Sequence, residues 1–240
     1  LHQELAGGTF VDVIIDQAHD PLDPHLFKGN VDIDKLKALV KKVGAENIPY
    51  VSLAGTVNMA GGQPVSMQNA RELRAYCDSQ GINVYLDATR MYENAFFIQE
   101  REEGYAEKTI AEILLEFCSY TDGAWMSAKK DNLVNIGGWL AVNDPKVAEQ
   151  ARTMVVVYEG LHTYGGMAGR DMEALAIGIA EGVQDDHVAS RVRQVRYLGK
   201  LLLDWDIPIV QPIGGHAIFV GAKRFYPHIP QDQFPSQTLA

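Results

Sequence analysis

Three short segments carry polar side chains of different chemical kinds, and each segment lies at the carboxyl end of an expected β-strand. They are Thr56-Val57-Asn58, Asp87-Ala88-Thr89-Arg90 and Ser127-Ala128-Lys129-Lys130-Asp131. The carboxyl ends of parallel strands meet at one edge of a sheet, where ligands bind in open α/β folds. An amide, a carboxylate with a guanidinium, and a lysine with a hydroxyl together form the set that a pyridoxal phosphate site requires.

Lys130 is the most informative of these residues, because an amine at a strand end can act as a nucleophile and as a base. Burial against a cofactor lowers the proton affinity of a lysine, which makes it available for Schiff-base formation. Ser127, three residues earlier, is suited to phosphate binding, and Lys129 lies beside the amine. Taken alone, these five residues favour a solvated Lys-Lys pair in a turn, so the catalytic interpretation depends on the other two segments.

Asp87, Arg90 and Asn58 would supply complementary contacts to a pyridine ring. A buried carboxylate at Asp87 could pair with a protonated ring nitrogen, and Arg90 could donate to the phenolic oxygen of the ring. The amide of Asn58 could bind a cofactor oxygen without bringing charge. As isolated motifs, the acid and the arginine are typical of a surface salt bridge, and an asparagine before a glycine-rich turn is typical of the turn itself.

Strand-like and helix-like segments alternate along the chain, which is the pattern of an α/β fold. The expected strands cover residues 10–16, 48–54, 82–88, 124–127 and 137–142. The expected helices cover residues 32–43, 66–80, 110–120 and 145–157, with Ser66 as an N-cap. A nearly unbroken helical pattern from 170 to 205 predicts one or two helices, and two further strands are expected at 207–210 and 216–220. We therefore expect a large domain over 1–183, and a linking helix with the start of a smaller domain over 184–240.

The composition excludes some classes of partner. The chain has 21 basic and 31 acidic residues in 240, a formal charge of −10, which argues against nucleic acid or an anionic membrane as a partner. Two cysteines are too few for a disulfide framework, and we expect a reducing cytoplasm. No apolar run approaches the roughly 18 to 20 residues that span a bilayer. The seven histidines show no metal-ligand spacing, and His216 is expected near the cleft between domains as a structural residue.

Taken together, the motifs resemble the aromatic amino acid β-eliminating lyases, the family of the tyrosine phenol-lyases and tryptophan indole-lyases. The resemblance runs through essentially all 240 residues, and its other motifs include Ala60-Gly61-Gly62-Gln63-Pro64-Val65-Ser66 and Tyr164-Gly165-Gly166. It implies pyridoxal-phosphate fold type I, which is aspartate aminotransferase-like: a large domain with a mainly parallel sheet, plus the start of a smaller α/β domain. It also implies that the chain is the central portion of a longer polypeptide.

The resemblance assigns roles to individual residues. Lys130 would be the Schiff-base lysine and the base for the α-proton, and Asp87 would partner the pyridinium nitrogen. Asn58 and Arg90 would bind the 3′-oxygen, with Arg90 taking part in catalysis, while Ser127 would contact the phosphate and Lys129 would shape the site. Asn135 resembles a position that contributes to a monovalent cation site, for K⁺, at a subunit interface.

The activity implied by the resemblance is β-elimination of L-tyrosine to phenol, pyruvate and ammonia by a homotetramer. Thr89 and the segment Val134-Asn135-Ile136-Gly137-Gly138 favour the phenol-lyase branch, whereas Pro227-His228-Ile229-Pro230 is closer to the tryptophan indole-lyases, which stay an alternative. A non-catalytic fragment that keeps only the fold is a second alternative. A transaminase is disfavoured, because aminotransferases usually have tyrosine where Arg90 stands. The leaving-group acid and the arginine for the substrate carboxylate are expected outside these 240 residues.

Overall fold

A four-stranded sheet forms the centre of the fold in the computed structural model, which describes residues 2–240, with side chains from residue 3. Leu1, where the predicted large domain begins, lies outside the described residues. The strands are β1 (Tyr50–Ala54), β2 (Asn83–Asp87), β3 (Gly123–Ser127) and β4 (Gly138–Val142), in the order β1-β2-β3-β4. The β1–β2 and β2–β3 pairs are parallel, and β4 runs antiparallel to β3. The predicted α/β class with a mainly parallel sheet is thus confirmed.

Capping side chains define the starts of the helices that the sequence predicts. Asp32 caps α2 (Ile33–Val43), and Ser66, as expected, caps α3 (Met67–Gln80) by accepting from Asn69 N. Thr109 and Glu112 form a capping box at α5 (Ile110–Cys118), and Asp144 caps α6 (Pro145–Tyr158). Each cap satisfies backbone N–H groups that the first helical turn leaves without a partner.

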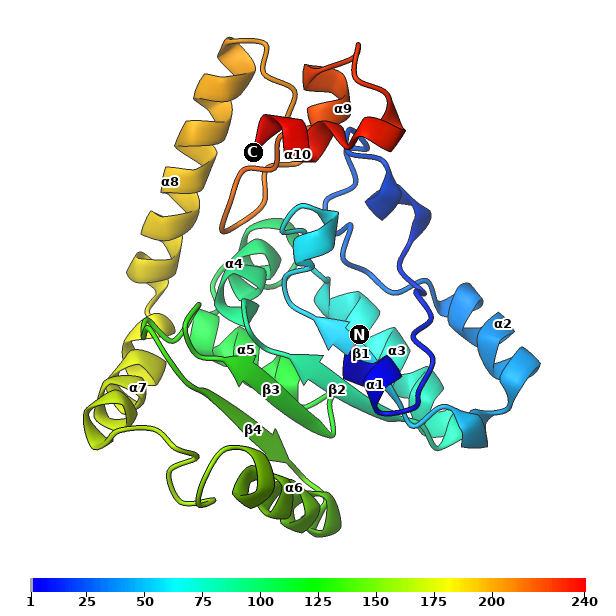
Figure 1. Cartoon of the computed structure of the whole chain (residues 1–240), viewed down its shortest axis with the longest axis vertical. Coiled ribbons are helices and arrows are strands. Elements are labelled where there is room, and N and C mark those ends of the chain that lie inside the picture. The colour runs from blue at the N-terminus through cyan, green and yellow to red at the C-terminus, as the bar shows by residue number, and fades with distance from the viewer. Residues whose placement is uncertain (1) are drawn as a thin grey trace.

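The core lies on the face of the sheet that α3, α4 and α5 cover. Val84 and Leu86 of β2 and Met126 of β3 are buried, and alternate residues of these strands point to the opposite face. Figure 1 shows α3 and α5 behind the strands and the short α1 (His2–Leu5) in front of them. On the opposite face, Tyr50 packs edge-on against Tyr85, with ring centroids 5.5 Å apart.

Helix α4 (Met91–Arg101) follows the motif that contains Asp87 and was not predicted from the sequence. Residues 91–98 are all buried, with Phe97 and Ile98 fully enclosed. A helix that is buried on all sides has no polar face, so its sequence lacks the amphipathic spacing by which the other helices are found. Helix α4 packs against α5 on one side and α8 on another.

The long helical pattern after residue 168 forms two helices, α7 (Gly169–Gly182) and α8 (Asp185–Asp204). Figure 1 shows α8, in yellow to orange, extending from the sheet layer to the C-terminal segment with α9 (Ala222–Phe225) and α10 (Pro235–Leu239). None of the described helices is both long and apolar enough to cross a membrane.

The predictions of strands at 10–16, 207–210 and 216–220 are wrong. The first of these segments makes only an isolated bridge between Ile14 and Val31, and the other two share a single antiparallel bridge, Ile209 to Val220. A strand needs a neighbour to complete its ladder of hydrogen bonds, and β-branched composition alone does not supply one. Phe10 and Val11 accordingly remain exposed.

Candidate active site

The carboxyl ends of β1, β2 and β3 are joined side by side by backbone hydrogen bonds. Gly55 N, just after β1, donates to Asp87 O over 3.1 Å, and Ala88 N donates to Trp125 O over 2.8 Å. Leu86 is buried in the core, so Asp87 points to the other face. The structure therefore brings the three motif segments to one edge of the sheet, as the sequence predicts.

Lys130 lies at this edge, one turn beyond β3, and is half-buried. Its Nζ donates to Ser127 Oγ over 3.1 Å, and the backbone N of Ser127 in turn donates to the Thr89 hydroxyl, also over 3.1 Å. Burial lowers the pKa of the Lys130 amine, and the positive charges of Lys129 and Arg90 lower it further, against an opposing effect of Asp87. A lowered pKa makes the neutral amine, which is the nucleophilic form, accessible at a lower pH.

Asn58 follows β1 in a short 3₁₀ turn and is exposed. Its Oδ1 atom lies 2.9 Å from His216 Nε2, and His216 Nδ1 lies 2.6 Å from Glu93 Oε1. The Asn58 oxygen faces the ring in this arrangement, so the amide N–H group of Asn58 points away from His216 and can donate to a ligand. His216 was expected near the domain cleft, and it holds a residue of the candidate site.

Glycines allow the segment that carries His216 to approach the turn after β1. Gly62 has φ +71°, and a Cβ atom there would lie 2.9 Å from His216 Cε1. A Cβ atom on Gly215 would lie 2.7 Å from Glu93 Cδ. Both positions exclude larger side chains, because protein interiors leave no room for an extra methyl group without displacement.

Glu93 is a residue of this site that sequence reasoning missed. Its side chain is 0% exposed, and its Oε1 atom accepts from the Thr56 hydroxyl over 2.5 Å as well as contacting His216. Lys, Glu, Arg and Asp are almost never fully buried unless they are paired. An acid just before the apolar run Ala95-Phe96-Phe97-Ile98 was the signal that could have identified it.

Arg191 of α8 was also missed, and it contacts two buried carboxylates. One guanidinium nitrogen, Nη2, lies 3.2 Å from Glu93 Oε2 and 2.8 Å from Asp131 Oδ1. The other oxygen of Asp131 accepts from Tyr92 N over 2.9 Å. Burial, with a smaller effect from Glu93, raises the pKa of the Asp131 carboxyl to about 6, against the opposing effect of Arg191.

The remaining predicted residues lie on more open surface. Lys129 and Asn135 are exposed, and Asn135 makes no side-chain hydrogen bond to another residue within the described range 2–240. Over the same range, no group of three or more His, Cys, Asp or Glu side chains is arranged to hold a metal ion. The structure thus places Lys130, Ser127, Asp87 and Arg90 together, and it gives Asn135 no partner in this part of the chain.

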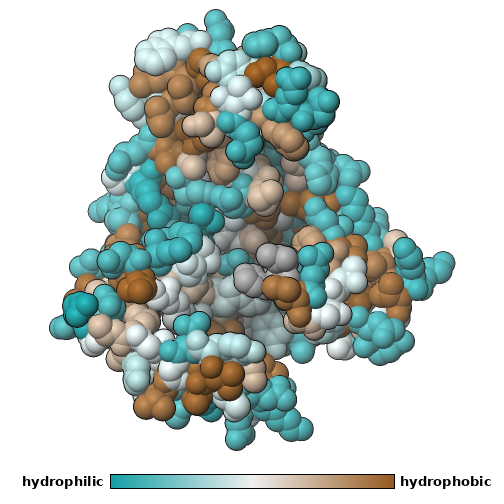
Figure 2. Space-filling model, in the orientation of Figure 1, coloured by the Kyte–Doolittle hydropathy of each residue, from teal (hydrophilic) through white to brown (hydrophobic). Residues whose placement is uncertain are grey.

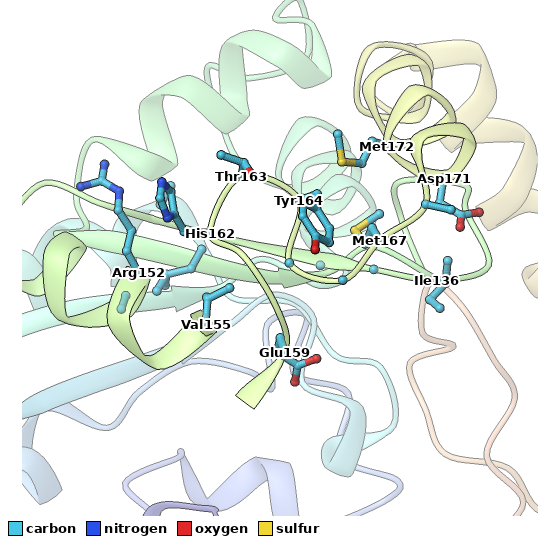
Figure 3. Close-up of a pocket in the computed structure, with 18 of the residues that line it drawn as sticks. Ile136, Arg152, Val155, Glu159, His162, Thr163, Tyr164, Met167, Asp171 and Met172 are labelled. Carbon is cyan, nitrogen blue, oxygen red and sulfur yellow. The ribbon is translucent and has the colours of Figure 1, made fainter. Parts of the chain in front are cut away.

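A separate hollow lies between β4, α6, the segment after α6 and the start of α7. Figure 3 shows Tyr164 and Met167 from the connecting segment beside Asp171 and Met172 of α7. Figure 2 shows apolar side chains gathered at the end of the molecule that α6 occupies, where Val157 and Tyr158 are exposed. Of the described residues that line this hollow, none belongs to the three strand-end motifs.

The donor set at the sheet edge fits pyridoxal phosphate. An amine of lowered pKa can attach to an aldehyde, a carboxylate can pair with a ring nitrogen, and amide, guanidinium and hydroxyl groups can bind oxygens. Lys130 and Asp87 come from adjacent strands, and the charges of Asp87 and Arg90 both act on the Lys130 amine. The chemistry of the residues, more than the size of any pocket, identifies this edge as the candidate active site.

Comparison with known proteins supports this interpretation. The beta-eliminating lyase family matches residues 1–229. The tyrosine phenol-lyase of Nostoc punctiforme is 68% identical over 240 residues, which are 100% of this chain and 51% of that protein. The tyrosine phenol-lyase of Symbiobacterium thermophilum is 64% identical over 239 residues, 100% of this chain and 52% of that protein. The chain thus spans about half the length of these curated relatives.

Solved structures with low sequence identity share the fold. A candidate L-allo-threonine aldolase from Listeria monocytogenes matches with a TM-score of 0.59 at 20% identity, over 78% of this chain and 46% of that one. A candidate aromatic amino acid beta-eliminating lyase/threonine aldolase from Exiguobacterium matches with a TM-score of 0.55 at 19% identity, over 77% and 49%. These two structures support the architecture alone.

Proposed function

Because this chain belongs to the beta-eliminating lyase family, we propose that it forms the central part of a pyridoxal-phosphate-dependent carbon-carbon lyase. The proposed reaction is β-elimination of L-tyrosine to phenol, pyruvate and ammonia. The observation that carries the proposal is the half-buried Lys130 at the carboxyl edge of three adjacent strands, where burial, Lys129 and Arg90 lower the pKa of its amine against the opposing effect of Asp87. Relatives at 64–68% identity that are named tyrosine phenol-lyase support the choice of substrate.

Each residue of the candidate site has a definite task in this proposal. When bound, the cofactor supplies an electron sink for the charge that develops at the α-carbon of the amino acid. Lys130 Nζ would hold the cofactor, and the same amine in its neutral form would accept the α-proton of the amino acid. Asp87 keeps a proton on the ring nitrogen, while Asn58 and Arg90 hold the 3′-oxygen. Ser127 binds the phosphate group, beside the exposed Lys129.

The division of the chain and its assembly belong to the same proposal. We assign residues 1–183 to a large cofactor-binding domain, and 184–240 to a linking helix with the start of a smaller domain. Helix α8 begins at Asp185, directly after this boundary. A homotetramer, a monovalent cation held in part by the exposed Asn135, and a cytoplasmic location complete the proposal. The exposed apolar residues of α6 and α7 support burial against further protein in the assembled enzyme.

The test is pyruvate release by the purified protein that contains this chain, supplied with pyridoxal phosphate and either L-tyrosine or L-tryptophan. Faster release from tyrosine, with equimolar phenol, is the expected result. Faster release from tryptophan, with indole, would assign the chain to the tryptophan indole-lyases. The absence of pyruvate with both substrates, although the cofactor is bound, would contradict the lyase function and favour a non-catalytic role.

A further inference from the structure

The Lys130 segment and the segment that carries His216 are joined through one arginine on α8. Arg191 Nη2 contacts Asp131, the residue next to Lys130, over 2.8 Å, and Glu93 over 3.2 Å. Glu93 contacts His216 over 2.6 Å, and His216 contacts Asn58 over 2.9 Å. A continuous chain of polar contacts therefore runs from one end of the candidate site to the other.

The carboxylates in this chain of contacts are deeply buried. Glu93 is 0% exposed and Asp131 is 1% exposed, whereas Arg191 is 26% exposed. Two buried negative charges beside each other are costly without a positive partner. Removal of Arg191 would leave Asp131 without its ion-pair partner and Glu93 with only the contacts to His216 and Thr56. The position of each carboxylate is therefore tied to the position of the Arg191 guanidinium.

Asp131 and Asn132, which follow Lys130, are closely packed, so a shift of Asp131 would displace the residues around it. A Cβ atom on Gly182 of α7 would lie 2.6 Å from Asp131 O. At the next residue, Asn132 Nδ2 donates to the Tyr92 hydroxyl over 2.6 Å, and Trp139 Nε1 donates to Asn132 Oδ1 over 3.1 Å. Asp131 and Asn132 are buried against α4 and α7, so these two residues cannot shift without displacing one of the helices.

We propose that Arg191 is a positioning residue, which sets the Lys130 segment and the Glu93–His216–Asn58 contacts in their working geometry from α8. The inference rests on the proposed function, because it assigns the cofactor to Lys130 and Asn58. Arg191 itself does not touch the cofactor in this account and acts only through Asp131 and Glu93. Because α8 links the sheet layer to the C-terminal segment, the same contact couples the site to the position of that segment (Figure 1).

A matched control lies one and a half turns further along α8. Arg196 also pairs with a carboxylate of α4, Glu100, and its side chain is likewise 26% exposed. One of its contacts, Nη1 to Glu100 Oε1, measures 2.5 Å. Arg196 has no contact with Asp131 or with Glu93, so its removal breaks an α8–α4 ion pair and leaves the site contacts intact.

The test compares Arg191→Met, Arg191→Lys and Arg196→Met with the wild type in three measurements. These are the dissociation constant for pyridoxal phosphate from its visible absorbance, the pH dependence of that absorbance, and the urea unfolding midpoint. Arg191→Met should weaken cofactor binding about tenfold or more and change the pH dependence of the absorbance. Arg191→Lys, which keeps the charge but loses the planar fork, should have an intermediate effect. In Arg196→Met, the dissociation constant for pyridoxal phosphate should stay within about twofold of the wild-type value, because an ion pair at the surface contributes little.

Two results would overturn the inference directly. One is a folded Arg191→Met variant with wild-type cofactor binding and absorbance, and the other is an Arg196→Met variant whose cofactor binding is weakened as strongly as that of Arg191→Met. If Arg191→Met does not fold, the isosteric Asp131→Asn variant decides: weaker cofactor binding supports the inference, and wild-type binding overturns it. A wild-type protein that does not attach pyridoxal phosphate at Lys130 would instead contradict the proposed function.

Discussion

Lys130 Nζ and Ser127 Oγ lie 3.1 Å apart on two sides of one tight turn after β3. The hydroxyl accepts from the amine, and the backbone N of Ser127 donates to the Thr89 hydroxyl after β2. The turn is therefore anchored to the neighbouring strand before any ligand binds. This anchoring places the nucleophile beside Asp87, and it supports a site that is largely formed in advance.

Substitution of the exposed Lys129 by Met should shift the pH dependence of cofactor attachment. The Lys129 charge lowers the pKa of the Lys130 amine, so its removal raises that pKa. Attachment by the neutral amine should then be slower near neutral pH and unchanged at high pH. The check is the rate of absorbance change after pyridoxal phosphate is added across a pH series. Lys146→Met, on α6, is the control, and an unchanged Lys129→Met profile would rule out this electrostatic effect.

Asp87→Ala should separate cofactor attachment from turnover. Lys130 remains, so pyridoxal phosphate should still be trapped by borohydride, whereas loss of the carboxylate partner should slow pyruvate release from tyrosine about a hundredfold or more. The measurements are single-turnover pyruvate formation and the mass of the reduced protein. Turnover within a few fold of the wild type would show that Asp87 does not hold the ring nitrogen.

Gly215→Ala should disturb the site through Glu93. The new Cβ atom would lie 2.7 Å from Glu93 Cδ, so the Glu93 side chain must shift and its contact with His216 is disturbed. We expect a loss of about 1–3 kcal/mol in unfolding free energy, typical of overpacking, together with weaker cofactor binding. Gly169→Ala is the matched control, because a Cβ atom there meets nothing within 4 Å. Equal stability of the two variants in urea would contradict the close approach.

Glu116 provides a test of stability away from the site. Burial raises its pKa, but hydrogen bonds from Lys108, Tyr105 and Arg71 outweigh burial and lower the pKa to about 2, from 4.5. A lowered pKa stabilises the folded state above pH 4.5, and this stabilisation is lost as the pH falls toward 2. Glu116→Gln should therefore cost on the order of 1 kcal/mol at pH 7, after allowance for solvent screening.

The check for Glu116→Gln is urea unfolding at pH 7 and again at pH 3.5. The difference in unfolding free energy between wild type and variant should shrink at the lower pH. Glu107→Gln, on the exposed turn before α5, serves as the control for loss of a surface charge. A difference that stays constant with pH would mean that the hydrogen bonds to Glu116 contribute no net electrostatic stability.

The sequence predicted those parts of the fold and site that depend on local patterns. Ser66 as an N-cap, the parallel strands and the grouping of Asp87 with Lys130 follow from capping chemistry, periodicity and the geometry of strand ends. Helix α4 was missed because its first eight residues are buried on all sides, which removes the amphipathic spacing. Residues 10–16 were wrongly predicted as a strand, because propensity does not supply a pairing partner.

Glu93 and Arg191 were missed for a different physical reason. The two residues are 98 positions apart, and neither lies in a motif that suggests chemistry. What brings them together is the packing of α8 on α4, which follows from the tertiary structure and not from local spacing. Asp131 was part of a recognised motif, but its burial between Tyr92 and Arg191 became visible only in the folded chain.

The most direct test of the account is to identify the lysine that carries the cofactor. The protein is incubated with pyridoxal phosphate, reduced with borohydride and digested, and the labelled peptide is sequenced by mass spectrometry. We expect a pyridoxyl group on Lys130 in the wild type and in Lys129→Ala, and its loss from that peptide in Lys130→Ala. A label on Lys129 or on another lysine, with Lys130 unmodified, would contradict the assignment of the active site.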